Sequence, residues 1–371
     1  MTTHAKLSAS SAHRWLSCSG SIKAEQGYSD KGSIYASEGT AAHALAEKCL
    51  LDDKPASSYI GETLDDVVVS KDMANHVQTY VDYVQAIGGT QFYEVRVDFS
   101  NIVPEGFGTS DVIAIVGNTL HVIDLKFGQG VAVSAENNPQ AMLYALGAMN
   151  DYGFIFDIQN IVVHIHQPRI NNISTWEVTP SDLHEWSEWV SERAKLALSD
   201  NAQRSPSDKA CQFCKAKADC KALHDYTTAL IGGDFDDLDQ PNDITDQRKR
   251  EIIGAKKLIL GWLDAIEQSI FDRLQNGEEV EGFKLVNGRS SRKWVEDEKL
   301  VASTLKQFIS EDEIYKKSIV TPAQAEKLIG KKNASEIESL IIKSEGAPTL
   351  AMDDDKRKSI GEKIADDFKV L

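Results

Sequence analysis

The stretch that decides the fold reads Thr119-Leu120-His121-Val122-Ile123-Asp124-Leu125-Lys126. It predicts a short apolar β-strand, in which residues two positions apart point to the same face. Asp124 and Lys126 therefore project together from one side, and Val122 continues that row into the core. A carboxylate beside a lysine is most often a simple salt bridge on a sheet surface. Its interpretation therefore depends on the motifs around it.

A partner strand precedes this stretch at residues 109–116, and Gly117-Asn118 predicts a tight hairpin between the two. Asp111 then lies on the strand next to Asp124 and Lys126. Two carboxylates suit a hard cation such as Mg²⁺. A lysine beside that cation can orient or stabilise an attacking oxygen.

Local signals predict the other elements. Asn138 and Pro139, at the cap and first position, begin a helix that places Gln140 and Tyr144 one turn apart. Thr40 is predicted to cap a helix that carries His43. Further helices are expected at 8–18, 72–86, 181–199 and 247–275, strands at 91–99, 161–166 and 175–178, and a hairpin at 283–294 around Asn287-Gly288.

Composition excludes some classes of protein. A net charge of −17 argues against a surface that grips nucleic acid by bulk positive charge, although a local basic groove is compatible with it. We find neither an apolar run of membrane-spanning length nor the apolar core of a signal peptide. We therefore expect a cytoplasmic protein that does not bind membranes.

The chain has five cysteines. Cys211, Cys214 and Cys220 form C-x2-C-x5-C, a spacing that favours a metal or cluster over a disulfide. With His224 the same segment reads C-x2-C-x5-C-x3-H, a possible zinc knuckle in which Cys18 has no part. Cys49 is expected to be a buried small hydrophobic residue.

The ordered motifs resemble those of the PD-(D/E)XK nuclease superfamily, in its RecB-like and Cas4-like exonuclease branch. This resemblance covers roughly residues 8–225. The chain also resembles the phage-encoded members of the branch, which accompany recombination proteins. The branch's G-T-x-x-H, G-x-x-D, D-x-K and Q-x-x-x-Y motifs are matched by Gly39–His43, Gly108–Asp111, Asp124–Lys126 and Gln140–Tyr144.

This resemblance implies an α/β fold, a mixed central sheet flanked by helices, with a mainly helical C-terminal region. The nuclease domain would span residues 1–230, an acidic linker 231–246, and the C-terminal region 247–371. The implied activity is that of a metal-dependent DNA exonuclease acting on DNA ends. A single-strand annealing recombination protein is a possible partner. The alternative is a catalytically silent DNA-binding or scaffolding relative with a zinc knuckle.

The resemblance also implies the roles of single residues. Mg²⁺ or Mn²⁺ would be held by Asp111, Asp124, the Leu125 carbonyl and His43. An imidazole ligand slightly favours Mn²⁺ over Mg²⁺. Lys126 would position or activate the water, with Glu94 as a further catalytic residue. Contacts with the DNA backbone are expected from Gln140 and Tyr144, and a [4Fe–4S] cluster from Cys18, Cys211, Cys214 and Cys220.

Overall fold

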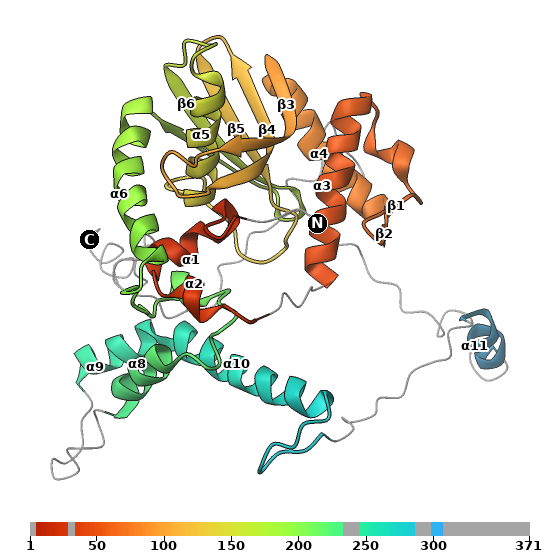
Figure 1. Ribbon diagram of the computed structural model, residues 1–371. Helices are drawn as coiled ribbons and strands as arrows, with labels where there is room; N and C mark the ends of the chain where they lie inside the picture. Colours follow the sequence, from red (N-terminus) through yellow and green to blue (C-terminus); the bar gives the residue numbers. More distant parts are fainter. Residues whose placement is uncertain (1–4, 29–33, 233–244, 286–297, 307–371) are drawn as a thin grey trace, which may run out of the picture. The chain divides into compact units, whose positions relative to one another are not determined.

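The computed structural model describes residues 5–28, 34–232, 245–285 and 298–306 (Figure 1). Backbone contacts divide the chain into two units, residues 1–272 and 273–371. The first unit holds the sheet and every predicted site residue. In the second unit, the described part holds the end of helix α10 and the short helix α11.

A five-stranded mixed sheet lies at the centre of the first unit, in the order β3-β4-β5-β6-β7. Its strands are β3 (Thr90–Asp98), β4 (Phe107–Val116), β5 (Thr119–Leu125), β6 (Asn160–Gln167) and β7 (Asn172–Val178). Strands β5 and β6 pair in parallel, while the other neighbours are antiparallel. Parallel neighbours need a crossover, and helix α5 supplies it. The α/β class with a mixed sheet is confirmed.

Helices and short elements complete the described chain. The α-helices are α1 (Ala12–Ser17), α2 (Ser21–Ala24), α3 (Ile34–Asp52), α4 (Lys71–Ile87), α5 (Pro139–Tyr152), α6 (Pro180–Leu198), α7 (Asp208–Cys211), α8 (Lys221–Gly232), α9 (Asp246–Gly254), α10 (Lys256–Gln275) and α11 (Glu298–Leu305). The 3-10 helices η1 (Ala9–Ser11), η2 (Ala56–Tyr59) and η3 (Pro168–Ile170), with the small hairpin β1 (Thr63–Leu64) and β2 (Val67–Val68), lie between them.

The predicted hairpin joins β4 to β5. Its register pairs Val116 with Thr119 and Ile113 with Val122. Gly117 in the turn adopts a φ of +60°, a left-handed conformation that glycine tolerates without steric cost. This register brings Asp111 to the same end of the sheet as Asp124.

Helices cover both faces of the sheet. Leu120 and Val122 of β5 pack into one core with α5 and α6, while Ile123 and Leu125 pack into the other with α3 and α4. Figure 1 shows α3 and α4 on one side of the sheet and α5 and α6 on the other. A strand that is buried on both faces reads as a continuous apolar run, which explains the composition of residues 119–125.

Helix α5 begins as predicted. The Asn138 side-chain oxygen accepts hydrogen bonds from the backbone N–H groups of Gln140 (3.1 Å) and Ala141 (3.3 Å), and Pro139 occupies the first helical position. The helix therefore begins at a defined residue, and its first turn lies next to Lys126.

Two predicted helix boundaries are wrong. Helix α3 begins at Ile34, so Thr40 lies inside it and donates its hydroxyl to the Ala36 carbonyl instead of capping the helix. The predicted helix at 247–275 is two helices, α9 and α10, separated at Ala255. Gly254 at the end of α9 weakens helical structure at that point.

Other predictions fall outside the described residues. They include most of the hairpin at 283–294, most of the linker at 231–246, and the chain beyond residue 306. Across the part of the chain that the structure describes, no helix combines the length and apolarity needed to cross a membrane.

Candidate metal centre

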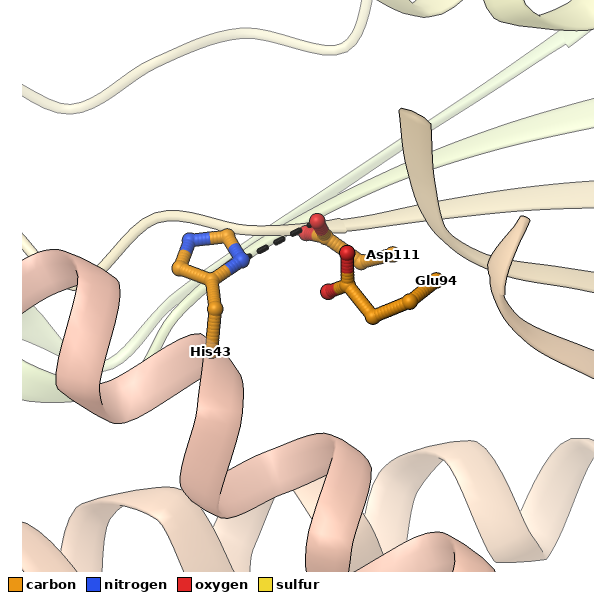
Figure 2. A group of neighbouring side chains, drawn as sticks. All are labelled: His43, Glu94 and Asp111. Atoms are coloured by element: carbon orange, nitrogen blue, oxygen red, sulfur yellow. Dashed lines mark hydrogen bonds and ion pairs between the residues drawn. The ribbon is translucent and has the colours of Figure 1, made fainter. Parts of the chain in front are cut away.

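Glu94 adopts an unusual backbone conformation within β3. Its φ is +46°, a left-handed value that is strained for a residue other than glycine. The ladder pairs Tyr93 with Val112 and Val95 with Ser110, and it omits a pair at Glu94. This local twist accompanies a side chain that points toward Asp111, as Figure 2 shows. Strain at a residue of a polar cluster is a feature that functional sites often carry.

Three side chains from three elements converge here. His43 of α3, Glu94 of β3 and Asp111 of β4 each offer one ligand atom, and these atoms lie within 4.8 Å of one another (Figure 2). Among the described residues this is the one such group of His, Cys, Asp and Glu. All three are partly buried, and their oxygen and nitrogen donors are typical ligands of divalent cations.

His43 and Asp111 form an ion pair at the centre of the group, with 3.0 Å between His43 Nδ1 and Asp111 Oδ1. Burial alone would lower the pKa of His43, but the charge of Asp111 and this hydrogen bond raise it to about 9. The imidazole is therefore protonated near pH 7. A cation bound at this position would take the place of that proton.

Glu94 is the acidic neighbour of the pair. Burial, followed by the negative charge of Asp111, raises the pKa of Glu94 to about 7. A carboxyl group with this pKa exchanges its proton near neutral pH. A divalent cation beside it would favour the ionised form.

Asp111 also joins this group to β5. Its second oxygen, Oδ2, accepts a hydrogen bond of 2.6 Å from the backbone N–H of Leu125. Asp124 and Lys126 therefore lie next to the three-residue group. The predicted role of the Leu125 carbonyl as a ligand stays a prediction.

Asp124 and Lys126 form a partly buried ion pair, in which Asp124 is 2% exposed and the Lys126 side chain is 29% exposed. Lys126 Nζ donates a hydrogen bond of 3.0 Å to Asp124 Oδ1 and lies 2.8 Å from Oδ2. Burial would lower the pKa of Lys126, but Asp124 raises it above its ordinary value, so the ammonium is charged. Asp124 Oδ2 is buried and accepts no hydrogen bond from the part of the chain that the structure describes.

Gln140 of α5 holds this pair. Its side-chain oxygen accepts from Lys126 Nζ at 2.9 Å, and its nitrogen donates to Asp124 Oδ1 and to the Tyr144 hydroxyl, both at 3.2 Å. Tyr144 itself is only 6% exposed. The predicted DNA contacts of Gln140 and Tyr144 stay predictions. Gln140 bonds Lys126 directly, and Tyr144 bonds Gln140.

The sequence of this chain matches a known protein family. A family described as "Protein of unknown function (DUF2800)" matches residues 4–358. The chain belongs to this family. One solved structure, "Crystal structure of SSO0001", is similar to this DUF2800 chain at 14% sequence identity over 56% of this chain and 95% of the other. Its TM-score is 0.24, which is too low to support an argument about the site.

The predicted cluster ligands of this DUF2800 protein line one small cavity. Cys18, Cys211, Cys214 and Cys220 all contribute to it, and all are free thiols. In the described chain, no three of these sulfurs lie within 4.8 Å of one another. A tetrahedral zinc site would bring its sulfurs to roughly 3.8 Å from one another, so the thiols do not form a closed site for a single ion.

His224 stands apart from the cysteines. Its side chain is 58% exposed, and its Nδ1 lies 3.1 Å from Asp225 Oδ1. The zinc-knuckle alternative therefore has no preformed ligand set here. Cys49, near the end of α3, is fully buried in the core, as predicted.

Hydrogen bonds within the chain join the segment around Cys18 to the segment that carries the other three cysteines. Arg14 donates to the Phe213 carbonyl at 3.1 Å, Glu25 accepts from the Lys215 backbone N–H at 2.8 Å, and the Tyr28 hydroxyl donates to Asp219 at 2.7 Å. Residues 12–28 are therefore held against residues 213–219 by these hydrogen bonds, and both segments line the cavity.

Sequence reasoning missed the contact of Gln140 with Lys126. Helical spacing places Gln140 and Tyr144 on one face, but it does not say which strand residue that face meets. The capping signal at Asn138 indicates where α5 begins along the chain, but not which strand residue its first turn contacts.

Proposed function

We propose that this protein is a metal-dependent deoxyribonuclease of the PD-(D/E)XK type, which hydrolyses phosphodiester bonds from DNA ends. The observation that carries the proposal is the convergence of His43, Glu94 and Asp111 next to the partly buried pair of Asp124 and Lys126. The order of these residues along the chain is the order in which the superfamily carries its motifs.

The donor set fits a divalent cation. The set includes Asp124 Oδ2, a buried carboxylate oxygen that lies 2.8 Å from Lys126 Nζ and forms no hydrogen bond among the described residues. Carboxylate oxygens of Asp111 and Glu94 and an imidazole nitrogen of His43 lie within 4.8 Å of one another, while the predicted ligand Asp124 lies outside that group. A mixture of carboxylate and imidazole donors favours Mn²⁺ over Mg²⁺. When bound, the metal would supply Lewis-acid charge at the phosphate and lower the pKa of a coordinated water.

The protein's own residues prepare that chemistry. The Lys126 ammonium is held between Asp124 and the Gln140 amide, so it presents a fixed positive charge at the edge of the acidic group. There it can orient the attacking water or stabilise charge that develops on phosphate oxygens. Tyr144 fixes the Gln140 amide in turn.

The expected substrate is suggested by the net charge of the chain and by its sequence motifs. The net charge of −17 gives no general affinity for DNA, so binding must be local to the lysine and its neighbours. Neither a base-reading motif nor a phosphate-binding loop for ATP was found in the sequence. We therefore expect digestion from DNA ends with little sequence preference and without ATP.

We extend the proposal to the four cysteines, as ligands of a [4Fe–4S] cluster. Support comes from the cavity that all four line. No three of these sulfurs lie within 4.8 Å of one another in the described chain, so the thiols are not arranged as a ready ligand set and the proposal rests on the shared cavity. Such a cluster would add metal bonds where hydrogen bonds already join the two ends.

The test of the proposed function is a digestion assay with two substrates, an end-labelled linear duplex and a covalently closed circle of the same sequence. Mn²⁺-dependent release of nucleotides from the linear substrate alone is the expected result. Efficient cutting of the closed circle would indicate an endonuclease. Binding of DNA without any cleavage would favour the silent DNA-binding alternative.

A further inference from the structure

The end of β6 organises the loop that follows the catalytic lysine. The His166 carbonyl accepts a hydrogen bond of 2.9 Å from the Lys126 backbone N–H. Next to it, the Gln167 side chain accepts from the Val133 backbone N–H at 2.6 Å and donates to the Val131 carbonyl at 3.3 Å. Consecutive residues of one strand thus hold both ends of the segment from 126 to 133.

Arg169, in the 3-10 turn η3 after β6, adds a third attachment to this loop. Its guanidinium lies 5.0 Å above the ring of Phe127, which is 6% exposed. With the Gln129 amide turned so that its oxygen faces the guanidinium, Arg169 Nε donates to it at 2.7 Å. Phe127 directly follows Lys126, so these contacts fix the chain next to the lysine.

The same guanidinium reaches the helix that carries the histidine. Arg169 Nη1 lies 2.7 Å from Glu38 Oε2, and the two side chains are 16% and 34% exposed. Glu38 belongs to α3 and precedes His43 by five residues. The pair is partly withdrawn from water and stacks on an aromatic ring, so it should be stronger than a fully exposed ion pair.

Arg169 therefore links two elements that contribute to the metal centre. One side of the guanidinium holds α3, which carries His43, and the other holds the loop that begins at Lys126. Metal ligands must be held to within roughly 0.5 Å of their productive positions. A single side chain that contacts both elements is well placed to set the distance between them.

We propose that Arg169 and Glu38 are positioning residues of the metal centre, which hold α3 against the loop after Lys126 so that His43 meets Glu94 and Asp111. This inference rests on the proposed function, because it assigns the pair to the same metal site. It differs from a purely stabilising role, in which the pair would support folding but leave metal affinity unchanged.

The test compares Mn²⁺ affinity, measured by calorimetry on the full chain without DNA, among variants of this pair. They are Arg169→Gln, Glu38→Gln, the conservative Arg169→Lys and the charge-reversed double variant E38R/R169E. Glu62→Gln is the matched control, because it removes the ion pair between Lys48 of the same helix α3 and Glu62. Melting temperatures without metal are recorded for all of them.

We expect both single neutral variants to bind Mn²⁺ about 10-fold to 100-fold more weakly, the range typical of residues that orient metal ligands. Arg169→Lys should recover part of that loss, because it keeps the charge but loses the planar stacking on Phe127. The reversed pair should bind more tightly than Arg169→Gln, and Glu62→Gln should bind like wild type. Melting temperatures alone should not predict this order.

Three outcomes would contradict the inference. Wild-type Mn²⁺ affinity in Arg169→Gln would leave the metal centre intact and overturn only the positioning role. Unchanged Mn²⁺ affinity with weakened DNA binding would make Arg169 a phosphate contact instead. Wild-type protein that binds no Mn²⁺ would overturn the proposed function and this inference with it.

Discussion

The ring of Tyr144 occupies the space that a side chain at Gly108 would need. A methyl group at Gly108 would lie 2.6 Å from Tyr144 Cε1, far closer than carbon atoms pack in protein interiors. Gly108 lies on β4 and Tyr144 on α5, so the absence of a side chain lets the helix approach the strand. That approach places Gln140, one turn earlier on α5, against Lys126.

The first prediction concerns this contact. Gly108→Ala should lower the free energy of unfolding by about 1–3 kcal/mol, the usual cost of overpacking, as measured by urea denaturation. Gly39→Ala is the matched control, because Gly39 also belongs to a motif but lies in α3 with open space around it. Alanine there should be neutral or stabilising by up to about 1 kcal/mol. Equal losses in both variants would contradict the packing account.

The second prediction separates the lysine from the amide that holds it. Lys126→Ala should reduce the rate of DNA hydrolysis by orders of magnitude while Mn²⁺ binding is largely kept, because the lysine is not a metal ligand. Gln140→Leu should reduce the rate by only about 10-fold to 100-fold, since it acts through Lys126. Parallel loss of Mn²⁺ binding and rate in Lys126→Ala would show that the lysine is structural.

The third prediction concerns acid stability. His164 and His166 are 5% and 4% exposed, and burial lowers the pKa of each to about 4, with the neighbouring His121 adding to the effect on His164. In the unfolded chain both regain a pKa near 6.5. Between about pH 6.5 and pH 4 the unfolded chain therefore binds protons that the folded chain does not bind. The free energy of unfolding falls as the pH drops through this range.

Each proton that only the unfolded chain binds changes the free energy of unfolding by about 1.4 kcal/mol per pH unit. His166 packs against the rings of both Tyr80 and Tyr83, and its Nδ1 has no hydrogen-bond partner among the described residues. His166→Phe should therefore fold. It should reduce the slope of the free energy of unfolding against pH by close to the value for one proton, about 1.4 kcal/mol per pH unit. Urea denaturation at pH 7, 6 and 5 measures that slope, and an unchanged slope would refute the assignment.

The fourth prediction concerns the cysteine cavity. Protein purified without oxygen should contain about four irons per chain and absorb broadly in the visible range. Cys18→Ser should lose that iron, because Cys18 lines the cavity with the three later cysteines. Cys49→Ser is the matched control, since Cys49 is fully buried elsewhere. Stoichiometric zinc that depends on His224 and not on Cys18 would replace the cluster with the zinc alternative.

Local sequence signals predicted the elements that carry the centre. The apolar run at 119–125, the Gly117 turn and the Asn138 cap each act over a few residues, so their consequences are visible in sequence. Thr40 and Gly254 show the limit of such signals. Helix α3 begins at Ile34, ahead of its apparent cap, and α9 ends at Gly254 within a continuous amphipathic pattern.

Longer-range relationships could not be predicted in this way. Arg169 and Glu38 are 131 residues apart in sequence, and no periodicity links them. The positive φ of Glu94 is a property of a ladder position, and nothing in the composition of β3 signals it. The resemblance to a nuclease superfamily supplied the order of the site residues, while their distances required the fold.

The most direct test of the central claim is Mn²⁺-dependent hydrolysis of end-labelled linear DNA by wild type, Asp111→Asn and Asp124→Asn, with melting temperatures recorded for each. An amide cannot supply the charged oxygen that a cation requires, so each variant should lose more than about 100-fold in rate while remaining folded. Hydrolysis at the wild-type rate by either folded variant would contradict the assignment of a metal-dependent nuclease to this site.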